Sequence, residues 1–390
     1  MKSDKAKVPA PKRLQKPNIA VRVLALTVTA ALVLGALVLV VYRDTLNVDT
    51  LKHWLASQDP EAGDAAPFTH AGGDKLSIAY LDSGVVTSST AGAHYYSLDG
   101  SPLADEVLSM ENPVLTTSRT TAAVYDAGNQ DLFVFRGGEE TFHLKLEGSN
   151  DLLSARVNDS GWLAVTAQQS RHKGAVTVYD SRGEVVIEIG LTTAFAVDAA
   201  VSPDKKNVAV VTISQKEGSF YSHLLFFPVN QQEPSAQVDL GSLMVLDLNY
   251  EDDVLWVLGE DRLITVTPDG ENVQTCGFSP SYLKGCSLDG NGFALLLTGR
   301  YRSGSADQAL IIDENAQVIH ALSLSSQILD YAAEGDYCAL LSGSRLTLYN
   351  SSLEPYSSLN DLQAARRLDL TANGSALLAN SQQAWLFVPQ

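Results

Sequence analysis

A unit of four short strands that recurs about every 40 residues constrains the fold of this chain more than any other feature. In the unit that starts at Ala155, the turns Asp159-Ser160-Gly161 and Ser181-Arg182-Gly183 are small and polar. The turn between the first and second strands recurs at intervals of 35 to 47 residues, and the turn between the third and fourth strands at intervals of 37 to 48 residues. The first kind of turn lies near Ser83, Ser118, Ser160, Lys205, Asp252, Gly290, Gly335 and Asn373. Units of this kind are typical of propeller blades, so we expect an all-β fold, a β-propeller.

The four strands of each unit, which we name a to d, differ in their pattern of apolar residues. Strand b is apolar on both faces, as in residues 254–258 and 293–297, which is expected of a strand packed between two neighbouring blades. The eight units predict eight blades, and seven is the alternative if the first unit is irregular. The last unit ends at strand c, so residues 67–70 are expected to supply its missing strand and close the ring.

Residues 23–42 form an uncharged apolar stretch of 20 residues. As a helix it would span about 30 Å, the thickness of the hydrocarbon core of a bilayer. Seven Lys and Arg residues precede it, so the positive-inside rule places the N-terminus in the cytoplasm. A cleaved signal peptide is the alternative, but the stretch is long for one and no small-residue cleavage site follows it. We therefore expect a basic cytoplasmic tail (1–22), a transmembrane helix (23–42), a juxtamembrane helix and linker (43–65) and an extracytoplasmic propeller at the cell membrane (66–390).

The charge of the chain divides at this apolar stretch. The chain carries −18 overall and residues 1–22 carry +6, so the remainder carries −24. A surface this acidic repels phosphate groups, which argues against nucleic acid as a partner. The three Cys residues include no CxxC pair, so neither a disulfide framework nor a zinc site is expected. Cys276 and Cys286 flank one loop and could pair, although a role as small buried hydrophobic residues is favoured.

Common catalytic and nucleotide-binding motifs are absent from the sequence. It contains no GxSxG, no HExxH, no GxxxxGK[ST] and no EF-hand loop, and its seven His residues show no ligand spacing. The sequence therefore predicts no catalytic residue, no metal site and no cofactor, and it favours a protein that is not an enzyme.

Residues 201–210 carry a family resemblance. The run Val201-Ser202-Pro203-Asp204-Lys205-Lys206-Asn207 resembles the Ser-Pro-Asp-Gly-Lys turn of WD40-like and TolB-like propellers, with Lys205 in place of the glycine. The Gly-His and Trp-Asp pairs of true WD40 repeats do not occur. Over nearly its full length the chain resembles an uncharacterised family of membrane-anchored propeller proteins from Firmicutes. The resemblance implies the layout described above and no known activity.

Three units have long connections between strands b and c, at residues 168–174, 214–223 and 299–308. Their positively charged residues, histidines and tyrosines are the candidate partner-binding residues: Arg171, His172, Lys173, Lys216, Tyr221, His223, Arg300, Tyr301 and Arg302. All b–c connections of a propeller emerge on one face, so we expect these residues to be neighbours on one rim. Loops on a rigid frame often carry function, and Arg and Tyr are enriched in binding hot spots. Exposed loops also accept charged residues without any function, which is the alternative.

Two functions follow from these observations. The favoured hypothesis is a binding or scaffolding propeller, held outside the membrane, that engages a protein or an anionic cell-envelope polymer through the long b–c connections. The alternative is a carbohydrate-active enzyme with scattered carboxylates in the central channel. Two close carboxylates with shifted pKa values, or a metal cluster, would favour the enzyme. The fold cannot decide between them, because one fold serves many chemistries.

Overall fold

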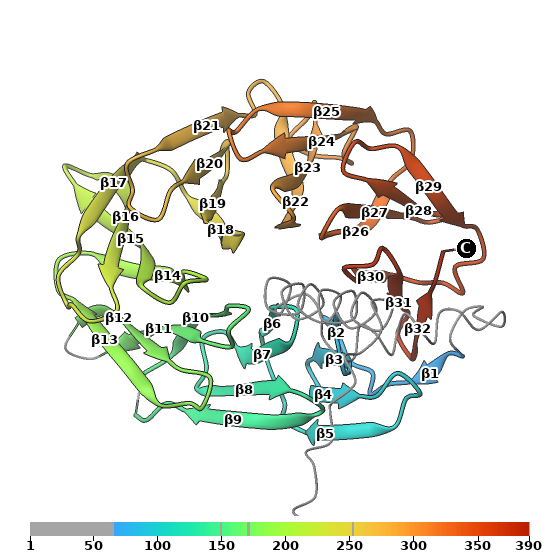
Figure 1. The fold of residues 1–390 in the computed structure, drawn as a ribbon, viewed down its shortest axis with the longest axis horizontal. Helices are drawn as coiled ribbons and strands as arrows, with labels where there is room; N and C mark the ends of the chain where they lie inside the picture. The colour runs from blue at the N-terminus through green and yellow to red at the C-terminus, as the bar shows by residue number, and fades with distance from the viewer. Residues whose placement is uncertain (1–65, 149, 170–171, 252, 390) are drawn as a thin grey trace, which may run out of the picture. The chain divides into compact units, whose positions relative to one another are not determined.

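The computed structural model describes residues 66–148, 150–169, 172–251 and 253–389. These residues form eight four-stranded antiparallel sheets arranged as the blades of a ring (Figure 1). The all-β propeller is confirmed with eight blades, and the alternative of seven is wrong. Within the described ranges, no helix is long and apolar enough to cross a membrane. The tail, the transmembrane helix and the juxtamembrane segment predicted at residues 1–65 lie outside the described residues.

Each of the first four blades places strand a nearest the axis of the ring and strand d at its outside (Figure 1). Blade 1 contains β2 (Ser77–Leu81), β3 (Gly84–Ser89), β4 (Gly92–Tyr96) and β5 (Pro102–Glu106). Blade 2 contains β6 (Pro113–Thr117), β7 (Thr121–Asp126), β8 (Asp131–Arg136) and β9 (Glu139–Lys145). Blade 3 contains β10 (Leu152–Val157), β11 (Leu163–Gln169), β12 (His172–Tyr179) and β13 (Val185–Leu191). Blade 4 contains β14 (Phe195–Val201), β15 (Asn207–Lys216), β16 (Ser219–Pro228) and β17 (Ala236–Gly241).

The next three blades repeat this order, and the eighth differs in one strand. Blade 5 contains β18 (Val245–Glu251), β19 (Val254–Gly259), β20 (Arg262–Val266) and β21 (Val273–Gly277). Blade 6 contains β22 (Tyr282–Gly290), β23 (Phe293–Gly299), β24 (Gln308–Asp313) and β25 (Val318–Ser323). Blade 7 contains β26 (Ile328–Glu334), β27 (Tyr337–Ser342), β28 (Leu346–Asn350) and β29 (Pro355–Leu359). Blade 8 contains β30 (Arg367–Leu370), β31 (Ala376–Ala379), β32 (Gln383–Phe387) and, as its strand d, β1 (Phe68–Thr69).

The N-terminal strand closes the ring, as the sequence predicts. Phe68 pairs with Ala384 and Thr69 pairs with Gln383. The Phe68 ring is buried, with its centroid 5.6 Å from that of Tyr96 in blade 1. The Tyr96 hydroxyl in turn accepts a hydrogen bond of 2.8 Å from the Ala71 backbone N–H. A strand of only two residues is therefore held to both the last and the first blade.

Apolar strands b form the core by packing against both neighbouring blades. In β15, Val208 and Val210 belong to a cluster shared with blade 3, whereas Ala209 and Val211 belong to a cluster shared with blade 5. Successive side chains of a strand point to opposite faces, so each blade has one apolar face for each neighbour. The continuous apolar pattern of strand b is thus explained by its position between two blades. Cys276, Cys286 and Cys338 are free thiols within these layers, so the possible pairing of Cys276 with Cys286 does not occur.

Candidate functional site

The predicted partner-binding residues lie on one side of the ring, which we call the b–c face because the b–c turns and the connections between blades emerge there. His172 and Lys173 begin β12 of blade 3, Lys216, Tyr221 and His223 belong to the β15–β16 hairpin of blade 4, and Arg300, Tyr301 and Arg302 follow β23 in blade 6. Arg171 lies outside the described residues. The others therefore lie on one face of the ring, but two blades separate those of blade 3 from those of blade 6.

Two of the three predicted long loops are continuations of strands. Gln169 pairs with His172 in blade 3, and Lys216 pairs with Ser219 in blade 4, where only two residues form the turn. In blade 4 the turn residues Glu217 and Gly218 have φ values of 53° and 83°, as a tight hairpin of type I′ requires. Both faces of a projecting hairpin are exposed to water, so the residues at these tips are polar. The pattern of apolar residues therefore did not predict that the strands extend this far. Only residues 300–307 of blade 6 form a true loop between strands.

The positively charged residues of this face differ in their partners. Lys173 Nζ donates to the Thr193 carbonyl at 3.1 Å and lies 5.3 Å from the centre of the Phe195 ring. Arg300 Nε lies 3.4 Å from Asp307 Oδ2, which holds the two ends of the blade 6 loop together. Lys284 Nζ donates to the Arg302 carbonyl at 2.9 Å and supports the same loop. In the part of the chain that the structure describes, Lys173, Lys216, Lys284 and Arg302 make no ion pair with a carboxylate.

Exposed apolar side chains on blades 4 to 6 are the feature of this face that the sequence reasoning missed. Of the 14 large hydrophobic side chains that are exposed in the described residues, seven lie here. We call these seven the apolar patch: Phe195, Phe220, Tyr221, Met244, Leu246, Tyr282 and Tyr301. Six of the others are spread over outer strands, and Val107 lies between blades 1 and 2. Apolar residues in the connections between blades, such as Met244, are the sequence feature that could have predicted this patch.

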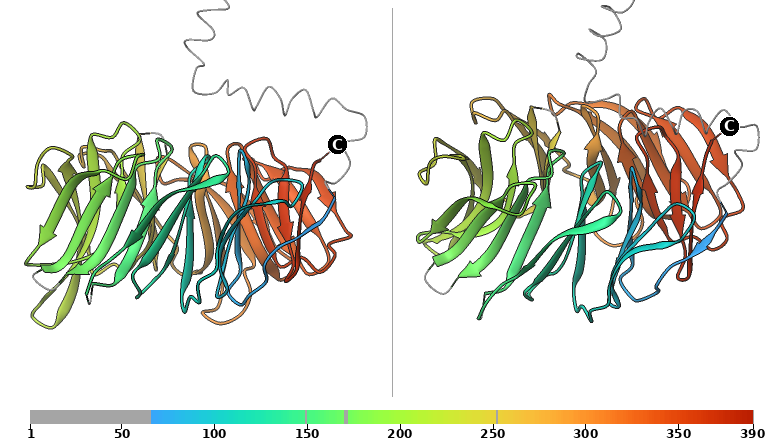
Figure 2. Two further views of the ribbon diagram at one scale, coloured as in Figure 1. Left: turned by 90° about the horizontal axis from the view of Figure 1, so that it is seen from below. Right: turned by 60° about the horizontal axis from the view of Figure 1, so that its bottom comes forward.

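Blade 5 projects less far from the b–c face than blade 4 and blade 6, which lie on either side of it. Its strand b ends at Gly259, opposite Val245, which is the first residue of its strand a. In blade 4 the pairing of strands a and b stops at Phe195 and Ile213, and the hairpin continues for three more residues to Lys216. Three residues of strand extend about 10 Å. In Figure 2 this hairpin and the blade 6 loop project from the side of the ring that is opposite the C-terminus.

Phe220 lies on the side of the blade 4 hairpin that faces blade 5. Side chains alternate along a strand, so Phe220 shares this side with Ser222 and Leu224. Ser222 Oγ donates to the Leu243 carbonyl at 2.6 Å, and Leu224 packs in the cluster shared with blade 5. The Met244 carbonyl accepts a hydrogen bond from the Glu260 backbone N–H at 3.1 Å. These contacts place Phe220 beside the connection that carries Met244.

A second concentration of charge surrounds the axis of the ring, on the innermost strands. Arg156 of blade 3 binds Asp198 of blade 4 through two nitrogens, at 2.9 and 2.7 Å, and reaches Asp247 of blade 5 at 2.7 Å. Asp330 Oδ2 accepts the Leu368 N–H of the next blade at 2.9 Å, and Asp369 Oδ2 accepts the Tyr80 N–H at 2.7 Å. Asp198, Asp247 and Asp330 each follow a β-bulge in strand a. These carboxylates join neighbouring blades.

Several carboxylates near the axis have raised pKa values. Burial raises the pKa of Glu334 to about 9, and the charges of Asp289, Asp369 and Glu251 add to the shift. Burial also raises the pKa of Asp369 to about 7, and burial together with the Asp247 charge raises that of Asp289 to about 6. The Asp289 side chain is nevertheless exposed, so water near the axis screens part of this effect. Among the described side chains, no group of three or more His, Cys, Asp and Glu residues is placed to hold a metal ion.

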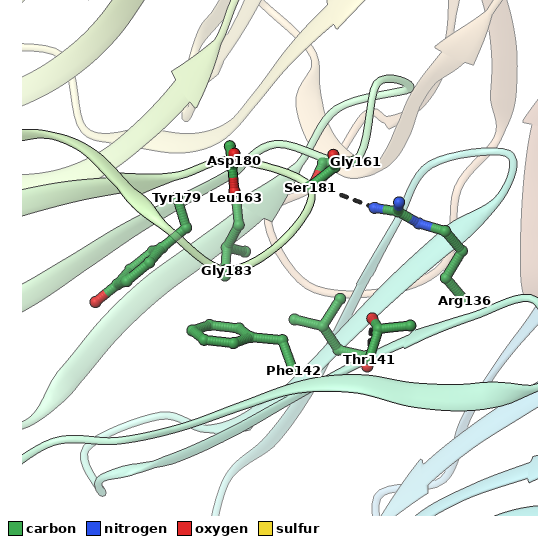
Figure 3. A pocket seen from close by; sticks show the side chains of 10 residues that line it. Arg136, Thr141, Phe142, Gly161, Leu163, Tyr179, Asp180, Ser181 and Gly183 are labelled. Atoms are coloured by element: carbon green, nitrogen blue, oxygen red, sulfur yellow. Dashed lines mark hydrogen bonds between the residues drawn. The ribbon is translucent and has the colours of Figure 1, made fainter.

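A small pocket between blades 2 and 3 is the remaining candidate (Figure 3). Its lining includes Phe142, Tyr179 and Arg136, whose Nη2 donates to the Gly161 carbonyl at 3.3 Å. Its free volume of about 10 Å³ is roughly enough for one water molecule. The pocket therefore has no room for an organic ligand.

A family model matches most of this propeller. The model for DUF5711, described as a family of unknown function, matches residues 68–353. The chain belongs to DUF5711. The match includes β1 and the whole apolar patch of the DUF5711 protein, and it ends within blade 7. A search of curated protein sequences finds no relative.

Solved structures similar to the DUF5711 protein are propellers of low sequence identity. The computationally designed Ika8 protein is 11% identical with a TM-score of 0.59, and the match covers 84% of this chain and 100% of that chain. BamB from Moraxella catarrhalis is 13% identical with a TM-score of 0.50, covering 83% of this chain and 99% of that chain. Apo AztD from Citrobacter koseri is also 13% identical with a TM-score of 0.50, covering 77% and 90%. At these identities the likeness shows the fold alone.

Proposed function

We propose that this DUF5711 protein is a binding or scaffolding propeller that holds a protein partner on its b–c face. The apolar patch is the observation that carries the proposal. Monomeric proteins rarely gather exposed apolar side chains in one region unless something binds there, and aromatic residues and Arg are enriched in protein interfaces. Tyr301 and Phe220 are 74% and 62% exposed at the two edges of the patch. An anionic cell-envelope polymer would need the positively charged residues of this face but not Met244 or Leu246, which favours a protein.

The proposal includes the expected location at the cell membrane, as the resemblance to membrane-anchored propellers from Firmicutes implies. Residues 23–42 would anchor the chain, with the N-terminus in the cytoplasm and the propeller outside. β1 runs antiparallel to β32, with Phe68 paired to Ala384 and Thr69 to Gln383 at the beginning of β32, so the described chain runs toward the b–c face along blade 8.

One experiment on intact cells tests the location and the binding face. Tyr301→Cys is introduced into a chain whose Cys276, Cys286 and Cys338 are replaced by Ala, with Arg182→Cys on the opposite face as the control. Both positions are exposed. A membrane-impermeant monofunctional maleimide should label both cysteines from outside. An impermeant reagent that carries a maleimide and a photoactivatable diazirine, which inserts into nearby bonds of any protein on illumination, should give a discrete adduct with a second protein from position 301 only.

The two reagents separate the parts of the proposal. Absence of labelling by the monofunctional reagent at both cysteines would contradict the extracytoplasmic location. Labelling at both positions, with an adduct from position 182 alone, would place the partner on the other face and contradict the binding proposal.

A second candidate function is an enzyme that acts at the axial carboxylates. The high pKa values of Glu334 and Asp289 favour it, because general acids need a proton near neutral pH. However, Asp198, Asp247, Asp330 and Asp369 are already engaged in contacts between blades. Release of sugar from purified cell-wall polysaccharide by the wild-type protein, lost in Asp289→Asn, would support the enzyme.

A further inference from the structure

We infer that the partner contributes one amphipathic protein segment that lies across blade 5 of the b–c face, with apolar side chains at its centre and carboxylates at both ends. This inference rests on the proposed function and adds the chemistry of the partner. It is drawn from the height of the blades, the apolar side chains of blade 5 and the charges on either side of it.

The height of the blades favours a single segment. The blade 4 hairpin continues to Lys216 and the blade 6 loop spans residues 300–307, whereas blade 5 turns within two residues, Glu260 and Asp261. A flat partner surface would meet the two taller blades first and would leave blade 5 uncovered. A helix or extended segment, about 10 Å across, can lie between them and reach the lower blade.

Blade 5 offers the apolar centre of this site. Met244 and Leu246 are 57% and 49% exposed, and they lie two residues apart at the beginning of strand a. Phe220 faces them from blade 4, and Tyr282, the first residue of β22, adjoins them from blade 6. Burial of large apolar side chains is favourable, so a few apolar residues of the partner are enough for a specific complex.

The charges beside blade 5 indicate carboxylates on the partner. Lys216 at the hairpin tip and Arg302 in the blade 6 loop are exposed, and neither makes an ion pair within the ranges that the structure describes. Arg300 already has Asp307, and on blade 5 Asp261 is paired with Arg262 at 2.7 Å. Glu260 on the blade 5 turn would repel a carboxylate above it. The partner carboxylates are therefore expected beside Lys216 and Arg302, at the two ends of the segment, and not over the blade 5 turn.

The test uses a phage-displayed library of random 16-residue peptides, selected on the full-length protein in detergent micelles. Enriched peptides should carry Leu, Phe or Trp flanked by Asp or Glu. Their binding is then measured by fluorescence anisotropy against three variants: Met244→Ser with Leu246→Ser, Lys216→Glu with Arg302→Glu, and Arg182→Glu with Lys205→Glu as the matched control on the opposite face. The first two variants should bind on the order of tenfold more weakly, and the control should bind like the wild type. Thermal melting checks that all variants fold.

A charge exchange provides the decisive comparison. A peptide whose Asp and Glu residues are changed to Lys should bind Lys216→Glu/Arg302→Glu better than it binds the wild type, because the attraction is reversed. A merely structural effect of these substitutions would not restore binding to the altered peptide.

The possible failures are distinguishable. Peptides that lose binding in Met244→Ser/Leu246→Ser but carry no acidic residues would overturn the inferred chemistry and leave the proposed binding face standing. Peptides unaffected by both patch variants would count against the face as well. If no peptide is selected but position 301 gives an adduct in cells, the inference of a single binding segment is wrong and the proposed binding face still stands. Binding of poly(glycerol phosphate) that depends on Lys216 and Arg302 but not on Met244 and Leu246 would mean that the partner is an anionic polymer and not a protein.

Discussion

Gly100 shows how one residue decides whether the ring can close. It lies in the c–d turn of blade 1 with a φ of 84°, a conformation that favours glycine. A Cβ atom added to it would lie 2.2 Å from the Cβ atom of Phe68. Phe68 is the first residue of β1, which completes blade 8. Because Gly100 has no side chain, Phe68 and the closing strand β1 can pack against blade 1.

Gly128 provides a matched control for this contact, since its φ is 86° and an added Cβ would have no neighbour within 4 Å. Gly128→Ala should lower the free energy of unfolding by about 1–2 kcal/mol, the cost of the left-handed backbone. Gly100→Ala should lower it by a further 1–3 kcal/mol, roughly, because it also collides with Phe68. Urea denaturation measures both. Equal losses would contradict the importance of the Phe68 contact.

The elements of this propeller differ most in where their strands end. The β15–β16 hairpin continues beyond its sheet and carries Phe220 and Tyr221, whereas β1 has only two residues. The segment around β1 is held mainly by side chains: Phe68 is buried, and the buried His70 ring places Nε2 3.0 Å from the Asn380 carbonyl. Strand length alone therefore does not measure how firmly an element is attached.

Replacing residues 67–70 by Gly-Ser-Gly-Ser keeps the length of the chain and removes both side chains. We expect a loss of at least about 3 kcal/mol in unfolding free energy, because a buried Phe alone contributes about that much. The same replacement at residues 301–304, in the exposed blade 6 loop, should change stability by no more than about 0.5 kcal/mol. Chemical denaturation followed by tryptophan fluorescence measures the difference. Equal stability of the two variants would rule out closure of the ring as a major source of stability.

A group of carboxylates from the innermost strands lies near the axis of the ring. The chain outside residues 1–22 carries −24, and the ring brings carboxylates from blades 4 to 8 toward one line. Glu334 holds its proton up to about pH 9 in the folded state, whereas an ordinary Glu releases it near 4.5. The folded state therefore binds more protons than the unfolded chain between these values. Stability must fall as the pH rises through this window.

Glu334→Gln should remove part of this pH dependence. The melting temperature of the wild-type protein should decrease between pH 5 and pH 9, roughly the range between the ordinary and the raised pKa. The variant should decrease less and should be the more stable protein at the alkaline end, since its amide stays uncharged. Glu184→Gln, at an exposed position of blade 3, is the control and should follow the wild type. A variant with the slope of the wild type would mean that Glu334 is charged in the folded state.

The sequence alone was sufficient for the features that depend on local patterns. The recurring turns predicted eight blades, and the missing last strand predicted closure by residues 67–70, because each blade repeats one pattern along the chain. The turn at residues 201–210 agrees with the resemblance. Lys205, which stands where similar turns have glycine, has a φ of 61°, in the left-handed region that favours glycine. The predicted residues of the rim share one face for the same reason, since all b–c turns emerge together.

Tertiary structure decided what depends on contacts between blades. Lys216 and Ser219 pair at a hairpin tip whose polar residues carry no strand pattern, because both faces of the tip meet water. Met244 and Leu246 are apolar like the core residues beside them, and only the low position of blade 5 leaves them exposed. Glu334 and Asp289 lie 45 residues apart in the chain and influence each other only because the ring turns their strands toward one axis. The periodic sequence determined the ring, and the arrangement of the blades in space determined which surfaces it presents to a partner.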